Sequence, residues 1–89
     1  MARRHNLEIT PELRQKVVDY HAWHGDQSAE IKRVTYDAEG YPYLLVHVLT
    51  AGGRKLSCIE YFDLDGDVFE MESCRRSDEQ EMVKQFRRR

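Results

Sequence analysis

A cysteine and a histidine offer this chain its best prospect for catalysis. Cys58 and His47 fall opposite each other if Gly52-Gly53 forms a two-residue turn, and a thiol beside an imidazole can form a reactive ion pair. The strand face that carries them is predicted to lie under a helix, where such a pair is structural. The sequence therefore predicts no catalytic residue, and a small Cys/His enzyme remains the lesser alternative.

Two further patterns invite comparison with metal sites. His21 and His24 are spaced to reach one ion, but structural zinc needs four closed ligands, and Cys58 and Cys74 are expected to face opposite ways. Residues 63–67 resemble part of a calcium loop, yet the glycine is fourth rather than sixth and the twelfth residue is cysteine rather than glutamate. The sequence predicts no metal and no cofactor.

Charge is strongly segregated along the chain. Residues 60–72 contain acids and no base. Bases gather near the two chain ends, where they form one positive patch if the ends converge. Its candidate nucleic-acid contacts are Arg75, Arg76, Arg87 and Arg88. Nucleic-acid binding is kept as an alternative, because the isoelectric point is about 6.1 and no nucleic-acid-binding motif is present.

Local signals predict a helix on each side of a strand-rich region. Thr10 is a good N-cap, Pro11 suits the first helical position and Gly25 suits the residue past the end, which predicts a helix from Pro11 to His24. Residues 77–80 read as a capping box and predict a second helix to about residue 87.

Strand patterns cover Glu30–Tyr36, Tyr41–Thr50 and two runs on either side of Asp65-Gly66. Short turns join all four, so the predicted fold is α+β: a helix, a four-stranded antiparallel meander and a helix. With Asp65-Gly66 as a two-residue turn, Phe62 faces Phe69 and Cys58 faces Ser73.

The two glycine turns also assign side chains to the faces of the sheet. The first face is expected to hold Tyr43, Leu45, His47, Leu49, Leu56, Cys58, Phe62, Leu64, Phe69 and Met71, with Glu60 as a misfit. The second is expected to hold Leu44, Val46, Val48, Ile59, Tyr61, Val68 and Cys74, edged by Asp63, Glu70 and Glu72. The sequence leaves open whether the helices cover one face or both.

Size and composition limit the remaining possibilities. The 89 residues are expected to form a single domain, 1–89, with residues 1–6 as a flexible basic arm. No apolar run approaches the length of a membrane span and no signal peptide is evident, so we expect a cytoplasmic protein with free cysteines. Because a core this small provides limited stability, which association can increase, the sequence leaves a homodimer open.

The favoured interpretation is a small non-enzymatic module that binds a protein with a basic surface. Its expected anchors are Val46, Ile59 and Tyr61, and its expected acidic rim is Asp63, Glu70 and Glu72. Small size and charge segregation are also typical of the accessory or inhibitor proteins that phages and mobile elements direct against host proteins. No motif in the chain supports that analogy.

Overall fold

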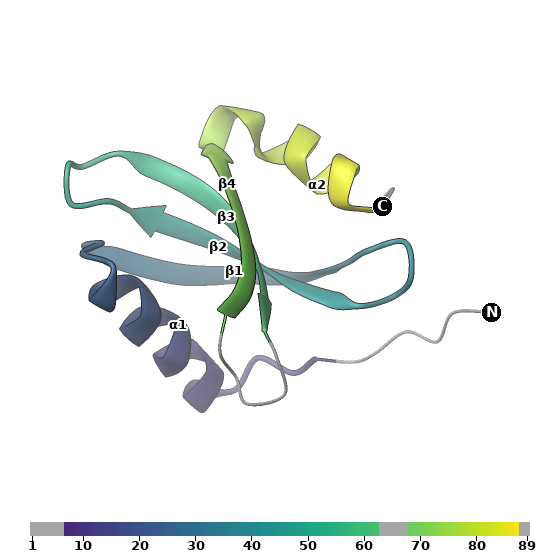
Figure 1. Ribbon diagram of the computed structural model, residues 1–89, viewed down its shortest axis with the longest axis horizontal. Helices are drawn as coiled ribbons and strands as arrows, with labels where there is room; N and C mark the ends of the chain where they lie inside the picture. The colour runs from purple at the N-terminus through teal and green to yellow at the C-terminus, as the bar shows by residue number, and fades with distance from the viewer. Residues whose placement is uncertain (1–6, 63–67, 88–89) are drawn as a thin grey trace.

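The computed structural model describes residues 7–62 and 68–87, and their arrangement confirms the predicted α+β fold (Figure 1). The elements are α1 (Pro11–Trp23), β1 (Ser28–Tyr36), β2 (Pro42–Leu49), β3 (Lys55–Phe62), β4 (Val68–Arg75), a 3-10 turn η1 (Arg76–Asp78) and α2 (Glu79–Arg87). Within the described ranges, no helix is long and apolar enough to cross a membrane.

The first helix begins and ends as its local signals predict. The Thr10 side chain accepts a hydrogen bond from the Leu13 backbone N–H at 3.1 Å, and Pro11 opens the helix. Gly25 follows with a φ of 88°, a left-handed conformation that glycine adopts without steric cost. The buried side chains of the helix are Val17 and His21, whereas His24 is exposed.

The second helix begins differently from the prediction. Ser77 lies inside η1 rather than at an N-cap, and the N-cap of η1 is Arg75, which makes no side-chain capping hydrogen bond, so the predicted capping box is wrong. The Glu79 carboxylate binds side chains of the sheet instead. This contact connects the start of α2 to the sheet.

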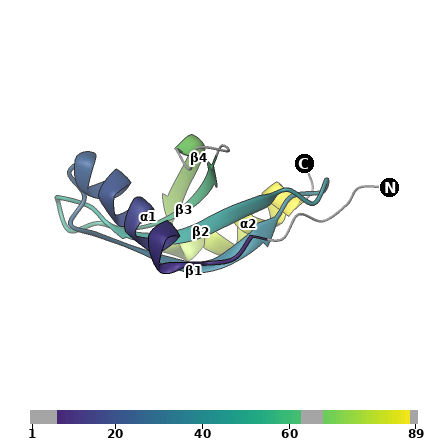
Figure 2. The same cartoon turned by 90° about the horizontal axis from the view of Figure 1, so that it is seen from below.

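The four strands form an antiparallel meander in the order β1-β2-β3-β4. The sheet is strongly twisted, and β4 curves away from the plane of β1 and β2 (Figure 2). The strands β1 and β4 are its two edges.

The predicted register between β2 and β3 is wrong by one residue. Val46 pairs with Cys58 and His47 with Ser57, so Cys58 and His47 are not opposite each other. The loop explains the shift: Gly53 donates its N–H to Thr50 O at 3.0 Å and has a φ of 82°. A three-residue loop of this kind replaces the expected two-residue turn, and an odd change in loop length moves every partner to the other face.

The predicted register between β3 and β4 holds over most of its length. Cys58 pairs with Ser73, as expected, and Cys58 and Cys74 are free thiols on opposite faces. The ladder then shifts after Tyr61, and Phe62 pairs with Val68 rather than with Phe69. This irregularity corrects the predicted pairing of the two phenylalanines. The predicted turn residues Asp65-Gly66 lie outside the described residues.

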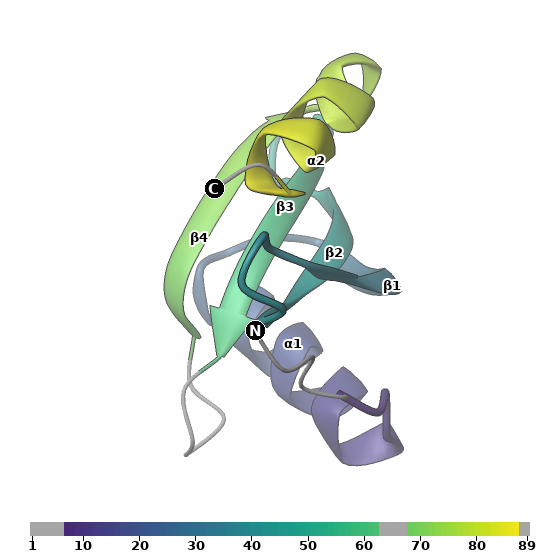
Figure 3. The same ribbon diagram turned by 90° about the vertical axis from the view of Figure 1, so that its right-hand side faces the viewer.

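Each helix covers one face of the sheet, which settles the layout that the sequence left open (Figure 3). We name the faces after these helices. The α1 face packs Val17 with Ile31, Leu44, Val46, Val48 and Cys58. The α2 face packs Met82, Val83 and Phe86 with Tyr43, Leu45 and Ile59. The predicted face memberships are therefore wrong for β2 relative to β3, because the register between these two strands differs.

Candidate functional site

The edge strand β4 presents acids and an apolar side chain on opposite faces. Glu70, Met71, Glu72 and Ser73 are all exposed. Glu70 and Glu72 pair with Tyr61 and Ile59, which places both acids on the α2 face. Met71 pairs with Glu60 and lies on the α1 face, where its side chain is 43% exposed. The middle of β4 is therefore open to solvent on both faces.

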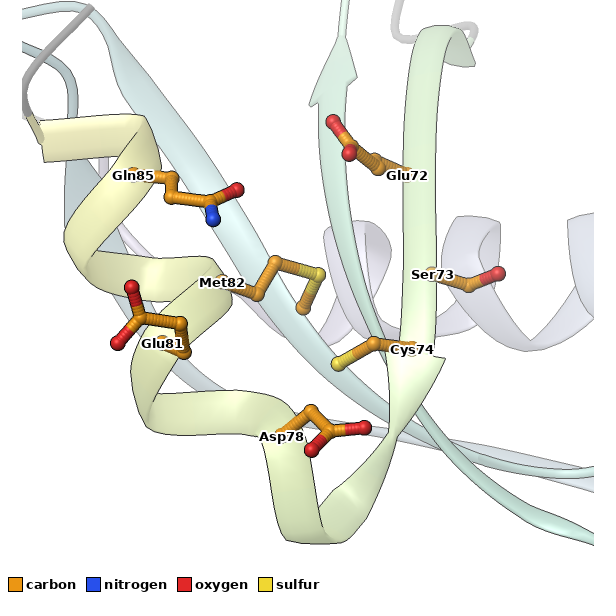
Figure 4. A pocket seen from close by; sticks show the side chains of 7 residues that line it. All are labelled: Glu72, Ser73, Cys74, Asp78, Glu81, Met82 and Gln85. Carbon is orange, nitrogen blue, oxygen red and sulfur yellow. The ribbon is translucent and has the colours of Figure 1, made fainter.

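A pocket of about 200 Å³ lies between β4 and α2 (Figure 4). We call it the acidic groove, and its lining residues are Glu72, Ser73, Cys74, Asp78, Glu81, Met82 and Gln85. Met82 and Cys74 point toward each other, while Glu72 extends from β4 toward the helix. The groove thus combines an apolar base with carboxylates and an amide at its margin.

The lining of the acidic groove is acidic, although one of its carboxylates, Asp78, has Arg75 Nε 3.6 Å from its Oδ2. The groove is lined by three carboxylates and by no lysine or arginine. Burial raises the pKa of the Cys74 thiol, and the charges of Asp78, Glu79 and Glu72 raise it further. A thiol held protonated is a poor nucleophile. The arrangement favours binding of a cationic side chain, whose aliphatic stem can lie on the apolar base.

The anchors predicted for a partner do not share one surface. Val46 is buried under α1, whereas Ile59 is buried under α2 on the opposite face. Tyr61 is half-buried on the α2 face, where its ring lies against Tyr43 and its hydroxyl donates to Asp37 at 2.5 Å. The grouping of Val46 with the other two anchors is wrong because of the β2–β3 register.

The predicted acidic rim is better placed for contact with a partner. Glu70 and Glu72 are exposed on one face of β4, and Glu72 lines the acidic groove. Asp63 lies outside the described residues. The fold therefore concentrates the exposed part of the predicted site at β4.

The arginines considered for nucleic acid lie at opposite ends of α2. Arg75 and Arg76 precede the helix, and Arg87 ends it. At about 1.5 Å per residue, the nine-residue helix separates the two groups by roughly 14 Å. Arg76 donates to the Leu56 carbonyl at 3.5 Å. Arg88 lies outside the described residues, so the described arginines do not form the single patch that convergence of the ends requires.

A buried polar cluster under α1 escaped the sequence analysis. The His21 side chain lies between two carboxylates, with Nε2 2.7 Å from Glu60 Oε2 and Nδ1 2.8 Å from Asp26 Oδ2. His21 is 2% exposed and Glu60 is 0% exposed. The sequence held one signal, since Glu60 was the misfit on an otherwise apolar face. Its partner is 39 residues away, and no local pattern identifies it.

The cluster under α1 binds a proton more tightly than free histidine does. Burial alone lowers the pKa of His21, but hydrogen bonds and negative charges of Glu60 and Asp26 outweigh it and raise the pKa above its usual 6.5. If both carboxylates are ionised, both ring nitrogens must donate and the ring is an imidazolium. The cluster thus acts as an ionic connection between α1 and the sheet.

A second polar cluster connects α2 to the sheet. Glu79 Oε2 accepts from Ser57 Oγ at 2.5 Å and lies 2.6 Å from His47 Nε2. The Ser57 hydroxyl is thus bonded to the carboxylate rather than to the imidazole, an arrangement that does not activate serine as a nucleophile.

The predicted Cys58–His47 pair does not form, because Val46 is opposite Cys58. Burial and then the charges of Glu60, Asp26 and Cys74 raise the pKa of the Cys58 thiol to about 12. The thiolate that nucleophilic chemistry requires is therefore scarce at neutral pH.

The two histidines considered for a metal do not come together, and residues 63–67, which resemble part of a calcium loop, lie outside the described residues. His24 is exposed, and its Nδ1 lies 2.9 Å from the Tyr20 carbonyl, whereas His21 points into the core. Across residues 7–62 and 68–87, no group of three or more histidine, cysteine or acidic side chains is placed to hold a metal ion.

No protein-family model, no curated protein and no solved structure matches this chain.

Proposed function

We propose that this protein is a non-enzymatic module that binds another protein through β4 and the acidic groove. One observation carries the proposal: the central residues of an edge strand, Glu70 to Ser73, are exposed beside a pocket lined by carboxylates. An exposed strand edge is a ready template for a further chain, and proteins usually protect such edges unless they use them. The partner surface that best complements these acids is basic.

Two alternatives receive less support from the same geometry. Phosphate groups would meet the carboxylates of the acidic groove between Arg75 and Arg87, which disfavours a nucleic-acid partner. Catalysis by Cys58 lacks the predicted His47 partner, and burial keeps its thiol protonated. A binding role needs neither a base nor a thiolate.

The cellular setting and the effect on the partner belong to the same proposal. Two free thiols in so small a domain suit the reducing cytoplasm. A module that occupies a surface of a larger protein would act as an accessory or inhibitor, as the sequence interpretation suggests.

Photo-crosslinking in the cells that produce the protein tests the proposal. A photoreactive amino acid replaces Met71 on β4 and, in a matched control, Glu12 on the exposed side of α1. We expect a discrete protein adduct at position 71 and none at position 12. The captured protein is then purified, and its binding to the wild type and to Glu72→Lys is measured by calorimetry.

Rebinding that weakens with Glu72→Lys, and not with Glu12→Lys, supports the proposal. The proposal fails if position 71 gives no discrete adduct, or if the purified adduct partner binds both charge variants as well as it binds the wild type.

A further inference from the structure

We propose that the partner supplies an extended segment that pairs with β4 as a fifth strand and alternates basic with apolar side chains. The inference rests on the proposed binding function and specifies the chemistry of the partner. Three features carry it: the open edge of β4, the alternation of its side chains and the charge of the acidic groove.

The first feature distinguishes β4 from the other edge strand. The ladder of β1 shifts between Ile31 and Arg33, and Lys32 is exposed at this irregularity. Bulges and lysines on an edge are common devices against pairing with another chain. The ladder of β4 also shifts, where Tyr61 pairs with Glu70 and Phe62 with Val68, but this irregularity precedes the four exposed residues from Glu70 to Ser73, which include neither lysine nor proline. The edge at β4 is therefore the better template for strand addition.

The second feature sets the side-chain pattern of the added strand. Side chains along a strand alternate between faces with a period of two. Glu70 and Glu72 lie on the α2 face, and Met71 lies between them on the α1 face. A neighbouring strand places its own side chains beside these. Basic side chains are favoured next to the two acids, and an apolar side chain is favoured next to Met71.

The third feature provides a position for one long basic side chain. The acidic groove adjoins β4 on the face that carries Glu72, and its volume of about 200 Å³ is below the roughly 300–1,000 Å³ of pockets for small-molecule ligands. The stem of a lysine or arginine can cover Cys74 and Met82 while its charged end meets Glu72, or Asp78 in place of the exposed Arg75 that lies 3.6 Å from it. This position would fix the register of the added strand.

A second copy of the chain fits this edge less well than a basic partner. Antiparallel pairing of β4 with another β4 brings glutamates from both copies together on one face, and like charges in neighbouring positions destabilise a sheet. Pairing of β4 with another copy's β1 meets the irregularity after Ile31. A heterologous basic segment avoids both penalties.

Synthetic peptides test the inference on the whole protein. The probe has eight residues, like β4, and alternates lysine with valine. Its controls have the same composition in two blocks, or glutamate in place of lysine. We expect the alternating basic probe to shift the amide NMR signals of β4 and to bind at least about tenfold more tightly than the block control, a difference of about 1.4 kcal/mol.

Charge reversal tests the side-chain pattern. Glu70→Lys with Glu72→Lys should weaken the basic probe about tenfold or more and allow the glutamate–valine peptide to bind. Glu39→Lys, an exposed acid in the β1–β2 loop, is the matched control and should leave both affinities unchanged. Equal loss of affinity in this control would show that only net charge matters and would overturn the inference.

Backbone methylation of the probe tests strand addition itself. Alternate N–H groups of a strand point to the same side, so methylation of one alternate set should abolish binding and methylation of the other should preserve it. Equal effects of the two sets would overturn strand addition.

Concentration-dependent shifts of β4 signals in the protein alone would instead identify a second copy as the occupant. A partner captured at Met71 that does not compete with the basic probe would leave the proposed function standing and refute this inference.

Discussion

The two faces of the sheet are connected to their helices by the same pair of residue types in opposite order. Under α1, the helix contributes His21 and the sheet contributes Glu60. Under α2, the sheet contributes His47 and the helix contributes Glu79. The first pair is fully buried, whereas both side chains of the second are partly exposed.

Burial gives these two pairs different energetic roles. A buried ion without its partner is costly, because neither water nor another charge replaces the lost interaction. A partly exposed pair loses less, because water solvates the remaining group. We infer that α1 is held in a single position by its cluster, while the α2 side tolerates change. The acidic groove, one part of the proposed binding surface, lies on the α2 side.

The largest expected effect is the loss of the buried histidine. His21→Ala leaves Glu60 without its partner and should lower the free energy of unfolding by about 3–5 kcal/mol in urea melts. Trp23→Ala is the control on the same helix, since this side chain is 83% exposed, and it should change stability by under about 0.5 kcal/mol.

A double substitution separates charge from packing at this position. His21→Leu with Glu60→Met should recover most of the stability that His21→Ala loses, because apolar residues of similar size often replace a buried ion pair without loss. A double variant as unstable as His21→Ala would contradict the assigned difference between the two faces.

The next largest effect concerns an aromatic residue on the α2 face. Tyr61 contacts the Tyr43 ring, with centroids 3.4 Å apart, and donates a hydrogen bond to Asp37. Tyr61→Ala should lower stability by about 2 kcal/mol, below the roughly 3–5 kcal/mol of fully buried aromatic residues. Tyr61→Phe keeps the ring and should cost about 1 kcal/mol in the same denaturant melts. If Tyr61→Ala left stability unchanged, Tyr61 would not contribute to packing and would be free to act as a binding anchor.

A smaller effect is expected at the partly exposed pair. Glu79→Gln keeps an oxygen that can accept from Ser57 and removes only the charge next to His47, so the cost should be about 1 kcal/mol. Urea denaturation measures this cost, and the control is Gln80→Ala, an exposed position next to Glu79 on α2. A loss as large as that of His21→Ala would remove the contrast between the faces.

The smallest expected effect is an opposite response of the two pairs to pH. The pKa of His21 is raised in the folded state, so its contribution is complete below about 6.5 and is lost as pH rises through the folded value. Burial acts to raise the pKa of Glu79, but hydrogen bonds from Ser57 and His47 and nearby positive charge lower it overall. Its contribution is complete above about 4.5 and is lost as pH falls through the folded value.

Urea melts between about pH 4 and pH 9 can separate these two contributions. His21→Ala should remove the alkaline part of the pH dependence, and Glu79→Gln should reduce the acidic part. If Glu79→Gln removed the alkaline part of the pH dependence, the assignment of the raised pKa to His21 would be wrong.

The elements themselves follow from residues close together in the chain. Thr10, Pro11 and Gly25 define α1, and the order of the four strands follows from apolar runs separated by short turns. The Asp65-Gly66 signal predicted the pairing of Cys58 with Ser73. These signals act over a few residues, so a sequence can carry them without knowledge of the fold.

The candidate site was predicted only where it depended on exposed charge. The acids Glu70 and Glu72 were recognised because a run without bases is visible in the sequence. No local pattern predicts the acidic groove, because Asp78 and Glu81 lie beside β4 only after the chain turns at η1. The sequence predicts Val46 and Ile59 on one surface because it predicts a two-residue turn between β2 and β3, one residue shorter than the loop in the structure.

The sequence by itself determined the elements, their order and the separation of acids from bases. The tertiary structure decided which side chains share a face, because alternation has a period of two and one extra loop residue at Ala51-Gly52-Gly53 exchanges the faces of β2 relative to β3. It also decided that Glu60 meets His21 under α1. Contact between residues so far apart in the chain depends on how a helix crosses a sheet, and no local preference specifies that crossing.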